Sequence, residues 1–258
     1  MVSAEVKISR EEIDKEVSRV VGDDDLPSAL SRFGAYIPIK EREEALEFVD
    51  ELMSEYPLQS LVTRMTIGPA NTLIRQAAVP DEHREAQLID YETRMISFFA
   101  LLAVAILDAI RERYGPIGGQ PGLFESFLID SAAAERIGAG VSLYESEDHD
   151  GAASVITPRL ERIIRRMAQA VGLPITGSLT DRGVTSGVRG LGKLLHEMKG
   201  RVPEAIRRYF TLLLSEPTSL NLRNLISHGL VDAVAQPQAA LLIHAACVLT
   251  LLDPKPAE

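Results

Sequence analysis

The feature that most constrains the fold is a helical pattern over residues 81–114, the longest periodic segment of the chain. Its centre, residues 95–107, is apolar except for Ser97, and Arg94 and Asp108 bound it. A membrane-spanning helix needs about 20 apolar residues, whereas this centre has 13. We therefore expect a buried core helix and no contact with a membrane.

The rest of the chain also has the spacing of helices, because apolar residues recur at intervals of three and four rather than two. Trp is absent and aromatic residues make up 5% of the chain, so little of it is typical of a sheet. The fold class that we predict is all-α. The expected helices span residues 10–21, 27–34, 40–56, 58–65, 70–77, 81–114, 123–144, 152–171, 191–198, 203–214, 220–228 and 238–252.

The clearest break in the pattern is the stretch 115–122, Gly-Pro-Ile-Gly-Gly-Gln-Pro-Gly, which is typical of a domain boundary or hinge. It divides the sequence into an acidic helical region, 1–114, a second helical domain, 115–253, and a short tail, 254–258. The single cysteine, Cys247, excludes an intrachain disulfide, and no N-terminal apolar run resembles a signal peptide. We expect a cytoplasmic protein.

The net charge of −10 argues at first against a nucleic-acid partner, but the charge is unevenly distributed. Residues 1–114 carry 22 acidic and 13 basic side chains, whereas residues 151–230 carry 12 basic and 5 acidic ones. The second region therefore has the sign that a phosphate-binding surface needs.

The strongest candidate for an active site is the short apolar helix pattern of residues 220–229, which carries Arg223, Asn224 and His228. Positions four apart share a helix face, so Asn224 and His228 are expected to project together, with Arg223 reaching over from the side. An arginine offers paired donors to phosphate oxygens, and a histidine at a helix end can transfer a proton near neutral pH. The trio suits phosphodiester cleavage without a metal.

The string Asn-Leu-Arg-Asn, three residues, then His-Gly (residues 221–229) resembles the motif of a prokaryotic branch of the HEPN superfamily (higher eukaryotes and prokaryotes nucleotide-binding). The resemblance extends upstream to residues 158–161 and 191–217, and does not include the first 114 residues. It implies that the C-terminal half is a HEPN-like helical bundle, preceded by an additional helical N-terminal region. HEPN domains include many metal-independent ribonucleases.

The same resemblance implies a homodimer through the C-terminal domain, with two copies of the motif facing one cleft. The implied reaction is endonucleolytic RNA cleavage by 2′-hydroxyl attack, which leaves a 2′,3′-cyclic phosphate. His228 would be the general acid or base, Arg223 would stabilise the phosphoryl oxygens, and Asn224 would orient one of them. Such an enzyme would be a toxin or defence effector, kept inactive by an inhibitory partner or by its own acidic half.

Two other functions stay open. The first is a non-catalytic module that binds RNA or a nucleotide, and the second is a helical interaction protein. In a purely structural role, Arg223 would bridge to an acidic residue of a neighbouring helix, Asn224 would bond a backbone carbonyl, and His228 would cap the helix end.

Further candidates for contact with the RNA backbone are arginines on the helices 152–171 and 203–214. They are Arg159, Arg162, Arg166, Arg207 and Arg208. A solvated surface is the alternative for the first three of them. In the same region, Glu161 and Arg165 are spaced to form an ion pair.

We expect neither a metal nor a cofactor. The acidic stretch 145–150 contains metal-ligand residue types, but consecutive acids in a turn cannot all converge on one ion. Gly187 and Gly192-Lys193 imitate a phosphate-binding loop, but Leu194 stands where a magnesium-binding hydroxyl is required. His244 and Cys247, in the apolar helix 238–252, are expected to be core residues.

Overall fold

The computed structural model describes residues 9–55, 64–67, 73–77, 80–176, 179–180, 183–184 and 187–253. Within these residues it contains ten α-helices, one short 3-10 helix and two small antiparallel hairpins, so the predicted all-α class is confirmed. In chain order the elements are α1 (Arg10–Val21), α2 (Leu26–Ala35), α3 (Arg42–Glu55), β1 (Arg64–Ile67), β2 (Leu73–Ala77), α4 (Pro80–Tyr114), η3 (Pro121–Phe124), α5 (Ser131–Glu145), α6 (His149–Ala170), β3 (Leu179–Thr180), β4 (Gly183–Val184), α7 (Leu191–Glu197), α8 (Glu204–Leu214), α9 (Leu222–Ser227) and α10 (Gln236–Thr250).

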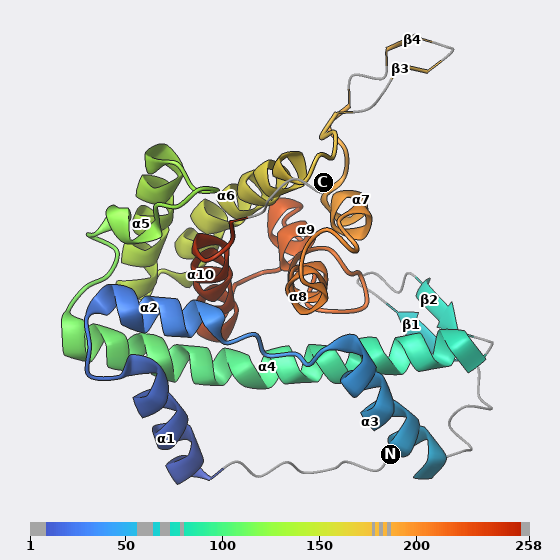
Figure 1. The fold of residues 1–258 in the computed structure, drawn as a ribbon, viewed down its shortest axis with the longest axis horizontal. Helices are drawn as coiled ribbons and strands as arrows, with labels where there is room; N and C mark the ends of the chain where they lie inside the picture. Colours follow the sequence, from blue (N-terminus) through green and yellow to red (C-terminus); the bar gives the residue numbers. More distant parts are fainter. Residues whose placement is uncertain are drawn as a thin grey trace.

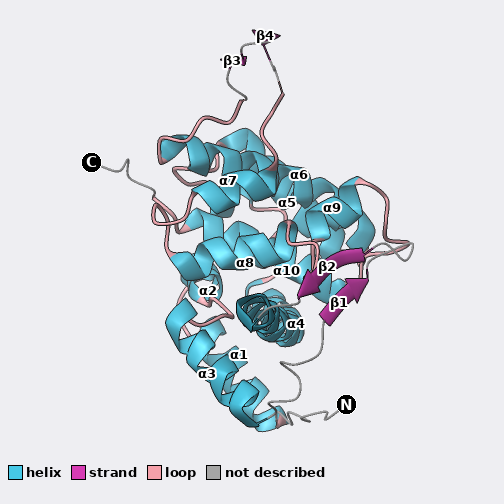
Figure 2. Ribbon diagram, turned by 90° about the vertical axis from the view of Figure 1, so that its right-hand side faces the viewer, coloured by secondary structure: helices cyan, strands magenta, loops and turns pink. Residues whose placement is uncertain are grey.

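The long helix α4 is the axis of the molecule (Figure 1). Helices α5 to α10 lie on one side of it, α1 and α3 lie on the opposite side, and α2 packs against both α4 and α10. The view along α4 shows the same arrangement, with the C-terminal helices above α4 and α1 and α3 below it (Figure 2). Both halves of the sequence therefore use α4 as a common support.

Helix α4 is a core helix on one face only. Ile96, Ala103 and Ile106 are fully buried, whereas Phe98 and Leu101 are 40% and 61% exposed. The expectation that residues 95–107 are buried is thus wrong for the second face. By length and composition alone, residues Glu82–Tyr114 could cross a membrane, and 39% of the most apolar window is buried inside the protein.

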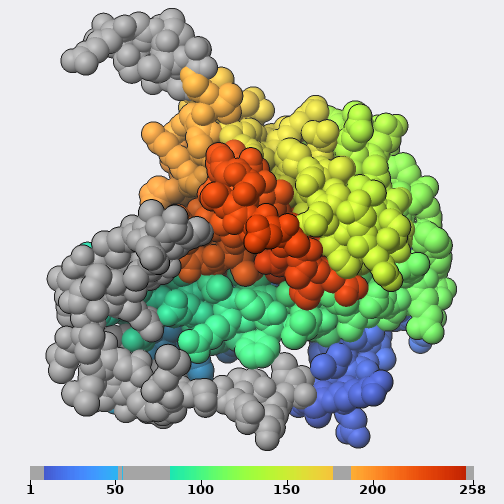
Figure 3. Space-filling model, turned by 180° about the vertical axis from the view of Figure 1, so that it is seen from behind, coloured from blue at the N-terminus to red at the C-terminus, as the bar shows by residue number. Residues whose placement is uncertain are grey.

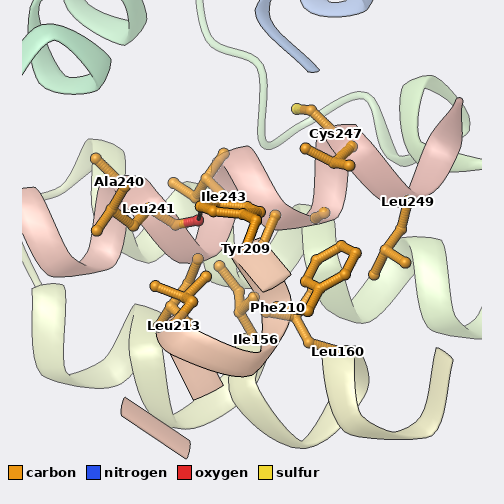
Figure 4. Packing of buried hydrophobic residues seen from close by; sticks show 14 of the residues in the cluster. Ile156, Leu160, Tyr209, Phe210, Leu213, Ala240, Leu241, Ile243, Cys247 and Leu249 are labelled. Carbon is orange, nitrogen blue, oxygen red and sulfur yellow. Dashed lines mark hydrogen bonds between the residues drawn. The ribbon is translucent and has the colours of Figure 1, made fainter. Parts of the chain in front are cut away.

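A single hydrophobic cluster contains residues from α1, α2 and α4 as well as from α5 to α10. Figure 4 shows the part of the cluster between α6, α8 and α10, to which these helices contribute Leu160, Phe210 and Ile243, respectively. His244 and Cys247 are fully buried in it, as predicted. Residue 114 ends α4, but the shared core spans that point, so a domain boundary there stays a prediction.

Local signals in the sequence determine some helix ends closely. Ser9 and Glu12 form the predicted capping box: the Ser9 hydroxyl accepts from the Glu12 amide at 3.2 Å, and the Glu12 carboxylate accepts from the Ser9 amide at 2.8 Å. Gly22 ends α1 with a φ of 62°, a left-handed value that favours glycine. The bounds of α1 are those predicted from the sequence.

Three predicted elements are wrong. The helices expected at 58–65 and 70–77 are not formed in the described part of those ranges, where β1 and β2 pair as an antiparallel hairpin instead. The helix expected at 123–144 begins only at Ser131, because Asp130 caps it by accepting from the Ala133 amide at 2.9 Å. Between α6 and α7, the two-residue strands β3 and β4 pair as a second antiparallel hairpin.

Candidate functional site

The candidate motif lies on α9, a helix of six residues between two left-handed turns. Asn221 precedes it with a φ of 49°, which asparagine tolerates better than most residues, and Gly229 follows it with a φ of 62°. Leu222 is buried and fixes the helix to the core, which brings α9 against α6 and α8. The predicted end at Gly229 agrees with this structure, and His228 is the C-terminal cap.

Arg223 forms a bidentate ion pair with Glu161 of α6. Its Nε donates to Oε2 at 2.7 Å and its Nη2 donates to Oε1 at 3.1 Å. The side chains of Arg223 and Glu161 are 25% and 16% exposed, so the pair is largely shielded from water. Two parallel N–H···O bonds fix the plane of the guanidinium, which a single contact would not do.

Asn224 completes the support of Arg223. Its Oδ1 accepts from Arg223 Nη1 at 2.7 Å, and its Nδ2 donates to Asn221 Oδ1 at 2.7 Å. The amide is therefore committed to the arginine and to the start of its own helix. No hydrogen bond joins the side chains of Asn224 and His228, although His228 donates its backbone N–H to the Asn224 carbonyl at 3.1 Å.

Glu161 is the centre of this network, because Arg165 Nη2 also donates to Oε1, at 2.6 Å. Burial alone would raise the pKa of Glu161, but the hydrogen bonds and charges of Arg223 and Arg165 outweigh it and lower the pKa below its usual 4.5. The carboxylate is thus ionised near neutral pH, and two arginines against one glutamate leave one positive charge. The predicted Glu161–Arg165 pair is confirmed.

Arg223 retains donors for a ligand. A guanidinium has five N–H groups, and the contacts with Glu161 and Asn224 use one each on Nε, Nη1 and Nη2. One N–H on each terminal nitrogen is left, and together these could bind two oxygens of a phosphate. In the described part of the chain the imidazole of the exposed His228 makes no side-chain hydrogen bond, so it is available for proton transfer.

The arginine row on α6 lies apart from this network. Arg162 Nη2 and Arg166 Nη1 donate to Asp130 Oδ2, at 3.3 and 2.8 Å, at the start of α5. At about 100° per residue, Arg159, Arg162 and Arg166 lie roughly 100–160° round α6 from Glu161. Contact of this row with RNA stays a prediction, but the row does not extend the motif.

Arg207 and Arg208 are not placed as RNA ligands, since both are 7% exposed. Arg207 donates to both oxygens of Glu204, at 2.7 and 2.6 Å. Arg208 Nε donates to Glu92 of α4 at 2.8 and 3.0 Å, and Glu92 is fully buried. This placement disagrees with the expectation of RNA contact, because each guanidinium is already paired with a carboxylate, and the partner of Arg208, Glu92, is itself buried.

The acidic stretch between α5 and α6 supports backbone amides. Glu145 accepts from the amides of Ile117 and Gly118 at 2.6 and 3.2 Å, and Asp148 caps α6 by accepting from the Gly151 amide at 2.8 Å. Asp150 accepts from the Val234 amide at 2.5 Å and so ties the segment after α9 to the start of α6. Among the described residues, no cluster of His, Cys, Asp and Glu has the geometry of a metal site.

Two pockets of about 180 Å³ each lie away from the motif. One lies between α4, α5 and the start of α10, next to Tyr144, and the other lies between α4 and α8, next to Arg208. Neither includes a residue of α9.

The support of Arg223 by two residues does not follow from the sequence pattern. Spacing along the helix predicts Glu161 as the partner of Arg165, but the structure also pairs it with Arg223, 62 positions away. Asn221 was part of the quoted string, yet its role of holding Asn224 depends on a left-handed backbone that sequence spacing does not reveal. No known family model, curated protein or solved structure matches this chain.

Proposed function

We propose that the protein is a metal-independent endoribonuclease of the HEPN type, with its site on α9. The observation that carries the proposal is an oriented arginine and an exposed histidine on the same short helix. The arginine is held by Glu161 and Asn224 and keeps donors for a phosphate, while the imidazole of His228, at the C-terminal end of α9, is exposed. A purely structural arginine would not account for the exposed histidine.

In the proposed reaction, the ribose 2′-oxygen forms a bond to the adjacent phosphorus and the bond from phosphorus to the 5′-oxygen breaks. A base takes the proton of the 2′-hydroxyl and an acid gives one to the leaving 5′-oxygen, and His228 performs one of these transfers. Arg223 stabilises the negative charge that develops on the phosphoryl oxygens. Asn224 is a positioning residue, because its side chain acts through Arg223.

One chain offers one such histidine at α9, whereas the reaction needs a base and an acid. A homodimer with both motifs at one cleft would supply the second. The proposal extends to a cytoplasmic protein that acts as a toxin or defence effector with an inhibitory partner. Growth arrest on expression, relieved by Arg223→Ala or His228→Ala, is the expected phenotype.

A non-catalytic module that binds RNA or a nucleotide, or a helical interaction protein, is the second candidate. The observation that favours the interaction protein is the Glu161–Arg223 ion pair, since the Glu161 carboxylate offsets part of the positive charge that would attract a phosphate. Binding of RNA or a nucleotide without turnover would support the module, and loss of a protein partner on changes in residues 1–114 would support the interaction protein.

The experiment is cleavage of end-labelled total RNA by the purified protein in EDTA. Arg223→Lys keeps the charge and removes the bidentate geometry, and His196→Ala removes an exposed histidine from α7 as the matched control. We expect the parent and His196→Ala to cut equally, and His228→Ala to be slower by about 10²- to 10⁴-fold. Circular dichroism and thermal unfolding verify that each variant is folded.

Equal cleavage by His228→Ala and the parent would contradict the assignment of the site. Retained RNA binding with no cleavage by any protein would favour the second candidate. A rate for Arg223→Lys equal to that of the parent would show that the bidentate orientation by Glu161 has no catalytic role.

A further inference from the structure

The solvent-exposed face of α4 is apolar at its centre. Packing of the opposite face in the core does not require apolar residues on this exposed face. Phe98 is 40% exposed and Leu101 is 61% exposed. Val104 and Ala105 on the next turn are half-buried, and Ser97 is exposed. Phe98 and Leu101 are two of the seven large hydrophobic side chains that are exposed in the described part of the chain.

Helix geometry places these residues in one stripe. At about 100° per residue, every member lies within roughly 60° of Leu101. The stripe consists of Arg94, Ser97, Phe98, Leu101, Val104, Ala105 and Asp108. Residues of the opposite face, such as Ala103 and Ile106, are fully buried. Figure 3 shows that part of the surface of α4 is uncovered on the back of the molecule.

The stripe has charged ends of opposite sign at equal distances from Leu101. Arg94 lies seven residues before Leu101 and Asp108 lies seven residues after it. Both are exposed, and neither forms an ion pair with any other residue that the structure describes, although Asp108 is close enough to the Tyr144 hydroxyl to affect it. The apolar patch therefore has a positive charge, Arg94, at one end and a negative charge, Asp108, at the other.

This symmetry fits a second copy of the same chain. When two α4 helices pack antiparallel with Leu101 on a two-fold axis, residues whose numbers are equally far from 101 lie opposite each other. Arg94 of each copy then faces Asp108 of the other, and Ser97 faces Ala105, two small residues that permit close approach. An isologous interface requires this self-complementarity.

We infer that the α4 stripe is the interface of a homodimer in which the two α4 helices pack antiparallel about Leu101. This surface belongs to the N-terminal region, in contrast to the expected dimer through residues 115–253. The inference does not rest on the ribonuclease proposal, since it follows from α4 alone.

The test is the oligomeric state of the full chain by sedimentation equilibrium at low and moderate salt. We expect a dimer that Leu101→Glu dissociates, because the charge would meet its own copy on the axis. Arg94→Glu or Asp108→Arg alone creates two like-charge pairs, and each should weaken the dimer at least about tenfold. The double variant Arg94→Glu/Asp108→Arg restores both pairs in reverse and should regain most of the affinity.

A cross-link tests the register. Leu101→Cys should form an intermolecular disulfide with its own copy on mild oxidation, because the axis brings the two residues together. The native Cys247 is 1% exposed and gives little background. Ser154→Cys, exposed on α6, is the matched control and should not cross-link.

Three results would overturn the inference. The first is a full chain that sediments as a monomer at all concentrations, and the second is a dimer that Leu101→Glu leaves intact. The third is a monomer that binds neutral lipid vesicles and loses this binding in Leu101→Glu. Because none of these measurements uses RNA, a failure of the dimer and a failure of the ribonuclease proposal are distinguishable.

Discussion

His244 links three helices of the core and makes a specific prediction for the dependence of stability on pH. Its Nε2 lies 3.1 Å from the carbonyl of Phe33 in α2, and its Nδ1 lies 2.8 Å from the hydroxyl of Tyr209 in α8. A carbonyl only accepts, so Nε2 carries the proton and Nδ1 accepts from the tyrosine. The neutral imidazole is thus fully hydrogen-bonded, and a second proton would place a positive charge in the buried core.

Burial lowers the pKa of His244 from 6.5 to about 3, although the backbone groups of Phe33 and Tyr36 oppose the change. In the unfolded chain the imidazole binds a proton below about pH 6.5, whereas in the folded protein it stays neutral. The unfolded state therefore binds more protons, and stability falls as the pH falls from about 6.5 towards 3. The slope is about 1.4 kcal/mol per pH unit, which amounts to about 2 kcal/mol by pH 5.

The assay is urea denaturation of the parent and of His244→Gln at pH 7.5 and pH 5. Glutamine offers a donor and an acceptor but no titrating group, so the variant should lose about 2 kcal/mol less than the parent over this range. The comparison uses the difference between two pH values, so a lower stability of the variant at pH 7.5 does not affect it. Equal losses in the two proteins would refute a neutral, buried His244.

Three further predictions concern packing and charge. Gly34→Ala should destabilise the protein by about 1–3 kcal/mol, because the new Cβ would lie 2.6 Å from the Cys247 carbonyl oxygen. Gly119→Ala, whose new Cβ would have nothing within 4 Å, is the control in the same urea titration. Equal unfolding midpoints for the two variants would contradict the close contact of α2 with α10. Arg208→Met should lower the stability by about 3–5 kcal/mol, because it leaves Glu92 buried without its partner. The double variant Glu92→Leu/Arg208→Met should recover most of this loss. A double variant no more stable than Arg208→Met in thermal unfolding would contradict the prediction. The pKa of Glu161 lies below 4.5, so the parent should lose stability as the pH falls below about 4.5. Glu161→Gln should lack the part of this loss that comes from protonation of Glu161. Identical acid unfolding curves for the two proteins would show that Glu161 makes no such contribution.

The helices could be predicted where local signals are strong. The capping box at Ser9 and the glycine at position 22 determine α1 without help from the rest of the chain. The start of α5 was predicted eight residues too early, because residues 123–130 are as apolar as a helix and only the cap at Asp130 distinguishes them. The hairpin of β1 and β2 depends on pairing between two segments, which the periodicity of either one does not reveal.

The polar part of the candidate site was predictable only in its residue types. The sequence indicated Arg223, Asn224 and His228, and spacing along one helix suggested the Glu161–Arg165 pair. The partner of Arg223 depends on how α9 packs on α6, which is a tertiary contact. The buried position of Arg208 has the same cause: charge alone favours a surface position, but Glu92 on the facing helix α4 makes burial possible. Arg207 is paired within its own helix, with Glu204.

The most direct test of the proposed function is cleavage, in EDTA, of a short RNA and of the same RNA with 2′-O-methyl groups at every position. We predict that the unmodified RNA is cut to fragments with 2′,3′-cyclic phosphate and 5′-hydroxyl ends, and that the methylated RNA is not cut, because its 2′-oxygen cannot attack. Cleavage of the methylated RNA, or fragments with 5′-phosphate ends, would contradict the proposed role of the α9 motif.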